Sequence, residues 1–119
     1  MRFPALIAAA FAAPILCGGA AAQTQFDGTY AGVSMTLSPG PGTRSCGQYN
    51  GAPTLTISGG RGQANWGTTG MLTGTVSPQG AVMLRNDFGA TLSAQIDARG
   101  TVRGTIGANC RYDAVWQKR

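Results

Sequence analysis

Apolar and polar residues alternate along most of the chain from residue 29 onwards. In Thr101 to Gly107, for example, Val102, Gly104 and Ile106 share one face, while Thr and Arg residues occupy the other. A period of two is typical of β-strands that bury one face. Eight segments have this pattern, and we expect each to form a strand: Thr29–Leu37, Thr54–Ser58, Gln63–Gly67, Met71–Ser77, Ala81–Arg85, Ala90–Asp97, Thr101–Gly107 and Cys110–Lys118.

Short turn motifs that end in glycine separate these segments. Ser77-Pro78-Gln79-Gly80 and Asp97-Ala98-Arg99-Gly100 suit type I turns, because the final glycine tolerates a positive φ. We interpret Gly59-Gly60-Arg61-Gly62 as a turn of the same length. Since such short connections pair successive strands, we predict an all-β protein, a small antiparallel up-and-down meander that closes as a barrel. A β-sandwich is the alternative.

The turns also predict which residues face each other. Val76, Val82, Ala94, Gly104 and Tyr112 should form one inward row, with Gly74, Leu84, Leu92, Ile106 and Cys110 in the next. On the outer face, this register places Arg103 opposite Asp113. In the first strand Val33 should face inward, and a bulge at Gly32 would shift Tyr30 out of phase with it.

The first 22 residues have the composition of a secretory signal. Arg2 supplies a positive charge, Ala5 to Cys17 is almost purely apolar, and Ala20 and Ala22 provide small residues before a polar stretch. The apolar run is short for a membrane anchor, and Pro14 interrupts it. We therefore predict a cleaved signal peptide over residues 1–22 and a single domain over 23–119 with no membrane span. The location would be periplasmic or secreted.

Two cysteines, Cys46 and Cys110, would remain after this cleavage, because Cys17 leaves with the signal. In an exported chain, two cysteines most simply form one disulfide bond. The bond would tie the long segment from Ser38 to Pro53 to the last strand. Two separate buried thiols are the alternative.

The composition offers little catalytic chemistry. The chain has no His, and its acidic residues are four Asp. The usual general base and the commonest zinc ligand are therefore missing. Asp87 and Asp97 fall in turns, where a carboxylate ordinarily binds the backbone. We predict no enzyme, no metal site and no cofactor. Asp27 and Asp113 would be the candidates if the protein were a small Asp-dependent enzyme.

Positive charge and aromatic residues suggest a binding surface. Lys and Arg number 9 against 4 acidic residues, which gives a net charge of +5. Arg85, Arg103 and Arg111 should share the outer face and form a mildly positive wall that binds polyanions weakly. Phe88 lies at the tip of a turn and Tyr49 in the long loop, positions from which both would contact a partner.

The opening Phe26-Asp27-Gly28-Thr29-Tyr30 and the ending Cys110 to Lys118 resemble parts of small uncharacterised exported bacterial β proteins with a single disulfide. The resemblance implies an envelope or secreted location and carries no functional residues. The chain contains no signature segment of the exported lysozyme and protease inhibitors of similar size.

We expect a non-catalytic binding module of the cell envelope or exterior that contacts a macromolecular partner, either a protein or a glycan. An inhibitor of an extracellular hydrolase is one form of this hypothesis, with the segment from Ser38 to Pro53 as its inserting loop. A small-ligand carrier with a barrel cavity is the alternative. Bulky inward residues such as Leu92, Tyr112 and Trp116 favour a filled interior over such a cavity.

Overall fold

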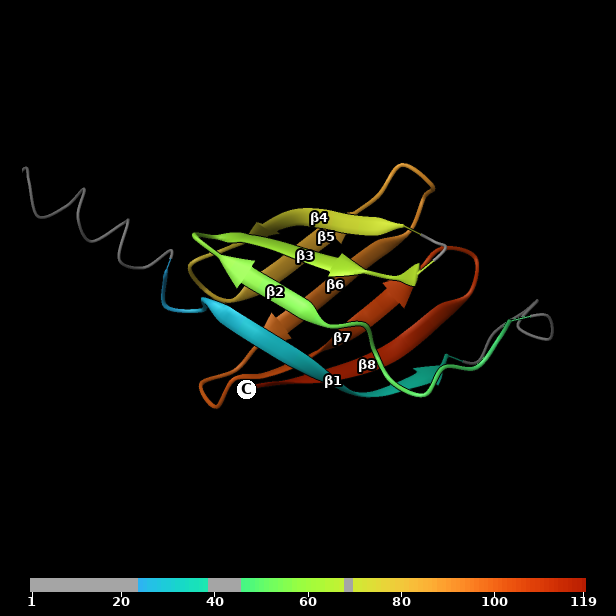
Figure 1. Cartoon of the computed structure of the whole chain (residues 1–119), viewed down its shortest axis with the longest axis horizontal. Helices are drawn as coiled ribbons and strands as arrows, with labels where there is room; N and C mark the ends of the chain where they lie inside the picture. The colour runs from blue at the N-terminus through green and yellow to red at the C-terminus, as the bar shows by residue number, and fades with distance from the viewer. Residues whose placement is uncertain (1–23, 39–45, 68–69) are drawn as a thin grey trace, which may run out of the picture.

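The computed structural model describes residues 24–38, 46–67 and 70–119, and these form one closed β-barrel (Figure 1). Each strand pairs antiparallel with the next in the chain, and the last pairs with the first. The strands are β1 (Gly28–Leu37), β2 (Leu55–Ser58), β3 (Arg61–Asn65), β4 (Met71–Val76), β5 (Ala81–Arg85), β6 (Thr91–Ile96), β7 (Thr101–Gly107) and β8 (Arg111–Lys118). The predicted all-β meander with barrel closure is therefore confirmed, and the predicted signal peptide lies outside the described residues.

The inward face of each strand fills the barrel with apolar side chains. The least exposed of these residues come from β2, β4 to β8: Leu55, Leu72, Val82, Leu92, Val102, Ile106 and Trp116. Burying one Leu or Ile side chain contributes about 1.5–3 kcal/mol relative to leaving it in water. The hydrophobic effect therefore explains why the period-two pattern of the sequence becomes a closed sheet around one core.

The register from β4 to β7 agrees with the prediction. Val76 pairs with Val82, Val82 with Ala94, and Ala94 with Gly104. Three turns that end in a glycine of positive φ, Gly80, Gly89 and Gly100, fix these pairings. Local turn chemistry is thus sufficient to align four consecutive strands.

The predicted register between β7 and β8 is wrong. β7 continues through Gly107, which pairs with Arg111, so the chain reverses over residues 108–110. Cys110 therefore lies in the connection instead of opposite Ile106. Tyr112 moves from the row of Gly104 to the row of Ile106.

The same shift removes the predicted pairing of charges on the outer face. Arg103 lies opposite Val115, and Asp113 lies opposite Thr105. Gly107 explains the difference, because its φ of 142° lets the strand extend one pair beyond the predicted turn.

The hairpin between β2 and β3 is tighter than predicted. Gly59 and Gly60 have φ values of 59° and 80°, the combination of a two-residue type I′ turn. Ser58 consequently pairs with Arg61, and β3 begins two residues earlier than the sequence pattern indicates. Arg61 is therefore an exposed strand residue, and Trp66 follows the end of its strand.

A bulge in β1 is confirmed, but its consequence differs from the prediction. The pairing with β8 shifts between Gly32 and Ser34, which leaves Val33 as the extra residue. Val33 points outward with 59% of its surface exposed, so its predicted inward position is wrong. The bulge lets both Tyr30 and Met35 reach the core, although they are an odd number of residues apart.

Candidate functional site

The two ends of the barrel carry different groups of residues. We call one the terminal end: it holds the start of β1, the end of β8 and the turns β2–β3, β4–β5 and β6–β7. We call the other the disulfide end: it holds the segment 46–54 and the turns β3–β4, β5–β6 and β7–β8. Figure 1 shows them at opposite ends of the long axis.

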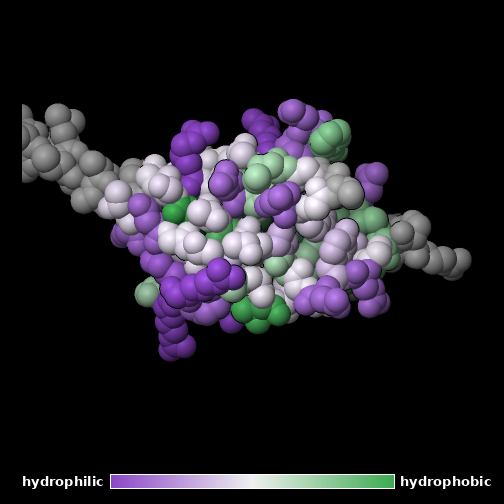
Figure 2. All heavy atoms as spheres, viewed as in Figure 1, coloured by the Kyte–Doolittle hydropathy of each residue, from purple (hydrophilic) through white to green (hydrophobic). Residues whose placement is uncertain are grey.

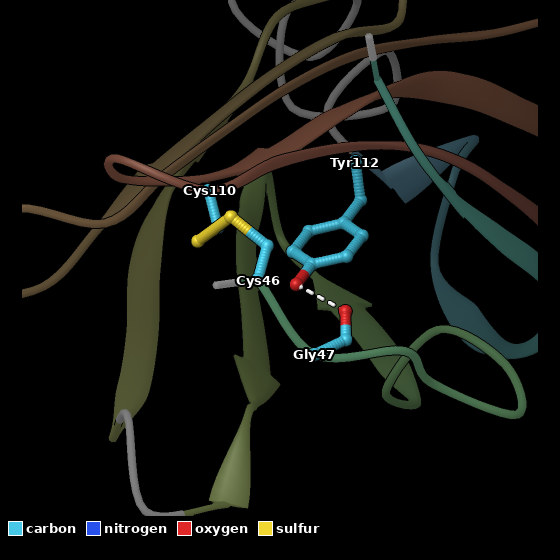
Figure 3. Close-up of a disulfide and its surroundings, with 4 residues drawn as sticks. All are labelled: Cys46, Gly47, Cys110 and Tyr112. Carbon is cyan, nitrogen blue, oxygen red and sulfur yellow. Dashed lines mark hydrogen bonds between the residues drawn. A yellow bond between two sulfur atoms is a disulfide. The ribbon is translucent and has the colours of Figure 1, made fainter. Parts of the chain in front are cut away.

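A disulfide bond fastens the segment 46–54 to the barrel. Cys46 and Cys110 are joined with a Cα–Cα distance of 5.6 Å, as predicted. The Tyr112 hydroxyl donates a 2.7 Å hydrogen bond to the carbonyl of Gly47, as Figure 3 shows. The Trp116 indole donates another, also 2.7 Å, to the carbonyl of a residue at the end of this segment, Pro53. The covalent bond is compatible with an oxidising compartment outside the cytoplasm.

Three aromatic rings gather under this segment, and we call them the aromatic cluster: Tyr49, Trp66 and Tyr112. The Tyr49 ring centroid lies 5.1 Å from that of Tyr112 and 5.5 Å from that of Trp66. Tyr112 and Trp66 meet edge to face at 6.0 Å. Burial, and in addition the adjacent Tyr49, raises the pKa of the Tyr112 hydroxyl. Tyr49 is the outermost ring, with 42% of its surface exposed.

The indole of Trp66 contains an unsatisfied hydrogen-bond donor. Trp66 is only 8% exposed, and its Nε1 has no hydrogen-bond partner among the described residues. Leaving a buried donor without a partner lowers the free energy of unfolding by about 1–3 kcal/mol. It is the one buried side-chain polar atom without a partner in the part of the chain that the structure describes.

Phe88 is displayed at the same end on a fixed turn. Its side chain is 75% exposed, as predicted for the tip of the β5–β6 connection. The Asn86 side chain accepts hydrogen bonds from the backbone of Phe88 at 2.9 Å and Ala90 at 3.0 Å, which fixes the turn. The ring lies against the neighbouring turn at Gly70, where an added Cβ would be 3.3 Å from it. Met71, the next residue, is itself 45% exposed.

The predicted arginine wall is divided by the structure. Arg85 and Arg111 lie in one cross-strand row of the outer surface. Arg85 pairs with Thr91, Thr91 with Gly107, and Gly107 with Arg111. Arg111 uses its guanidinium within the protein, since it donates to the hydroxyls of Thr91 at 3.5 Å and Thr105 at 3.1 Å.

Arg103 does not belong to this row. It lies on β7 four residues before Gly107, near the terminal end. The pKa of Asp97 is lowered by backbone hydrogen bonds, chiefly from Thr101, and also by the charges of Arg99 and Arg103. The charge of Arg103 therefore acts at the terminal end and not in the row of Arg85 and Arg111.

The sequence pattern placed Arg61 in a turn, whereas the structure places it on a strand. The type I′ turn places it on the outer face of β3, where it lines the same surface hollow as Arg85. The Gly-Gly pair ahead of it was the available signal, because two successive residues of positive φ indicate a two-residue turn.

The terminal end is filled by the residues that precede β1. Phe26 packs against the core, and its carbonyl accepts a 2.7 Å hydrogen bond from Tyr30. The Asp27 carboxylate accepts a bond from the backbone of Gly59 at 2.9 Å. Asp113 pairs with Thr36 at the opposite end of β1, so the fold does not bring the two candidate catalytic carboxylates together.

Within the described ranges, no three acidic, Cys or His residues are grouped to hold a metal ion. In the same ranges, no helix has the length and apolar character needed to cross a membrane. No family model, no curated protein and no solved structure matches the chain.

Proposed function

We propose that the protein is an exported, non-catalytic binding module of the cell envelope or exterior, and that its disulfide end contacts a protein partner. Three exposed apolar side chains at this end support the proposal: Phe88, Met71 and Tyr49. Protein interfaces draw most of their binding energy from a few apolar or aromatic anchors of this kind.

The observation that most supports this proposal is that Phe88 is three-quarters exposed on a turn that hydrogen bonds hold in place. An exposed phenylalanine loses apolar contacts that a partner would restore. Its backbone is fixed by the Asn86 side chain and its ring leans on Gly70, so binding would require little ordering of the turn. Exposed Val33, by contrast, is a single bulge residue on the side of the barrel.

A periplasmic or secreted location fits this proposal. The Cys46–Cys110 bond would persist in such a compartment, and the predicted signal over residues 1–22 would deliver the chain there. Inhibition of an extracellular hydrolase by the loop from Ser38 to Pro53 stays a prediction, because residues 39–45 lie outside the described part of the chain. The filled core gives no support to the small-ligand carrier.

The test compares two exposed apolar positions on protein purified after export of the full 119-residue chain. Wild type, Phe88→Ala and the matched control Val33→Ala are immobilised and exposed to envelope extract, and bound proteins are quantified. A protein retained by wild type and Val33→Ala should bind Phe88→Ala at least about tenfold less, as for an interface anchor. Equal retention by all three proteins, or no specific retention by wild type, would contradict the proposal.

A further inference from the structure

Three hollows adjoin one another on the outer surface of β2 to β6, and we call them together the trough. The first is lined from β2 to β4, the second from β4 to β6, and the third lies between Arg61 and Arg85 with a volume of about 580 Å³. Thr73 lines all three, and Arg61 and Arg85 each line two. Because they share lining residues, the hollows lie side by side on the sheet. Four strand spacings give the trough a width of about 19 Å along the curved sheet.

Polar, mostly uncharged side chains line the trough together with two exposed methionines, Met71 and Met83. Its hydroxyl and amide side chains come from outward positions of successive strands: Thr56, Ser58, Gln63, Thr73, Thr75 and Thr91. Figure 2 shows the side on which β2 and β3 lie in front, and the surface there is mainly white to purple, the colours of weakly to strongly polar residues. Such groups offer hydrogen bonds to a hydroxyl-rich ligand.

Two arginines flank β4 within the trough. Arg61 on β3 lies opposite Thr75, and Arg85 on β5 lies opposite Thr73. Two strand spacings and a two-residue offset put their Cα atoms about 12 Å apart. Neither guanidinium has a hydrogen-bond or ion-pair partner among the described residues, in contrast to Arg111, which donates to two threonine hydroxyls.

The charge of the trough is net positive. Among the described residues that line the three hollows, Asp87 is the one acid against two arginines. An unpaired guanidinium presents a planar set of donors that matches a carboxylate or a sulfate in bidentate fashion. The trough therefore combines two anion-binding groups with hydrogen-bonding groups between and around them.

We propose that the trough binds an acidic polysaccharide, a chain of sugars that carry carboxylate or sulfate groups. Arg61 and Arg85 would each hold one anionic group, and the threonine hydroxyls between them would bond to sugar hydroxyls. A chain fits the trough better than a single ion, because the adjacent hollows follow one another from β2 to β6. Single-stranded nucleic acid fits it less well, since none of the lining residues is an aromatic on which bases stack.

This inference goes beyond the proposed contact at the disulfide end. The two surfaces meet at Met71, which lines the third hollow, but the trough proposal depends on Arg61 and Arg85, and the contact proposal depends on Phe88. Binding in the trough would hold the protein on a polysaccharide-coated surface while Phe88 stays available to a partner. The two proposals therefore fail separately: Phe88→Ala should leave binding to polysaccharide unchanged.

The experiment measures affinity by calorimetry at low and moderate salt for the protein obtained from the full chain. The ligands are polygalacturonate, which carries carboxylates, dextran sulfate, which carries sulfates, and neutral dextran. The test variant is Arg61→Gln with Arg85→Gln. The matched control, Arg103→Gln with Arg119→Gln, removes the same charge outside the trough. Thermal unfolding checks that all variants fold.

The test variant should bind at least one of the two acidic polymers about tenfold more weakly than wild type, because it loses both guanidinium groups of the trough. The affinity of the control variant should stay within about threefold of wild type, because exposed charges outside the trough contribute little. Neutral dextran should not bind. Arg61→Lys with Arg85→Lys keeps the charge but loses the planar fork, and should give an intermediate affinity.

Three results would overturn the inference. No measurable binding of either acidic polymer is the first. An equal loss in the test and control doubles is the second, because it would assign binding to net charge alone. The third is a single-stranded DNA of the same charge that binds as tightly and with the same dependence on Arg61 and Arg85.

Discussion

The terminal end and the disulfide end of the barrel are closed by different interactions. At the terminal end, backbone groups join neighbouring turns: Val76 donates to Gly60 at 2.8 Å, and Ile96 donates to Gly80 at 2.9 Å. At the disulfide end, the turns that reverse the chain at Trp66 and Asn86 close their own hairpins. The segment 46–54 is joined to the barrel there by a disulfide and by side-chain donors.

This difference separates a structural end from one with groups free for binding. At the terminal end, backbone groups and side chains such as Ser77 and Asp97 together satisfy the turns. The disulfide end is covered by aromatic side chains, and it leaves the Trp66 donor without a partner and Phe88 in solvent. Unsatisfied donors and exposed aromatics are groups whose contacts a partner would complete, and for this reason the proposed protein contact is placed at this end.

Removal of the disulfide should have the largest effect and should be confined to one end. Replacing both Cys46 and Cys110 by alanine removes a link between residues 64 positions apart. The free energy of unfolding should fall by up to about 4 kcal/mol in the chain-entropy model. Urea unfolding measures the loss, and amide hydrogen exchange should speed up in 46–54 before the terminal end. Equal acceleration at both ends would show that the two ends are not independent.

Replacing one glycine at each end by alanine should show that the terminal end is more tightly packed than the disulfide end. The two glycines have similar φ values. Gly80 at the terminal end and Gly89 at the disulfide end have φ values of 88° and 87°. An added Cβ at Gly80 would lie 2.9 Å from the carbonyl of Ile96, whereas at Gly89 it meets nothing within 4 Å. Both variants should lose about 1–2 kcal/mol to backbone strain, and Gly80→Ala should lose more. Equal unfolding free energies would contradict this.

Two tyrosine hydroxyls provide a matched pair, one from each end. Tyr30 donates to the carbonyl of Phe26 and Tyr112 to that of Gly47, both at 2.7 Å. Replacing either by phenylalanine should cost about 1 kcal/mol, the net value of one hydrogen bond. Only Tyr112→Phe should expose Tyr49 further, because Gly47 belongs to the same segment. Solvent perturbation of tyrosine absorbance measures that exposure, and an unchanged spectrum would contradict the expectation.

The smallest expected effect is a difference in acid sensitivity between two turns of the same geometry, one held by Asp97 and the other by Asn86. Asp97 accepts hydrogen bonds from the backbone of residues two and four positions ahead, Arg99 and Thr101, and Asn86 does the same in its own turn. The pKa of Asp97 is lowered, so its ionised form is bound more strongly in the folded state. This contribution is present above the ordinary carboxyl pKa of about 4 and is lost as the pH falls through the lowered value.

Acid should therefore loosen the Asp97 turn and leave the Asn86 turn unaffected. Amide hydrogen exchange at Thr101 should increase below about pH 4, relative to Ala90. Asp97→Asn should remove this dependence on pH, because an amide does not titrate in this range. A pH-dependent exchange that persists in Asp97→Asn would assign the effect to another group.

The sequence predicted correctly those parts of the fold that local chemistry controls. The pairing from β4 to β7 follows from three turns ending in Gly80, Gly89 and Gly100, and the exposure of Phe88 follows from its place in a turn. The predictions failed where one glycine changes the length of a turn. Gly60 moved the start of β3, and Gly107 moved the register of β8.

The candidate sites were less accessible to sequence analysis than the fold. Tyr49 was recognised as a loop residue, but its contact with Trp66 and Tyr112 joins three segments far apart in the chain. Arg61 and Arg85 are likewise brought to one hollow only because β3 and β5 both pair with β4.

The amino-acid sequence by itself determined the strands, most of the turns and the pairing of the two cysteines, because these depend on alternation, glycine φ and the small number of thiols. Tertiary structure alone decided how β1 meets β8, and therefore that the sheet closes as a barrel. It also decided which aromatic rings and guanidinium groups become neighbours. Contacts between residues distant in sequence depend on strand register and on packing around one core, and neither is encoded in any short segment of the chain.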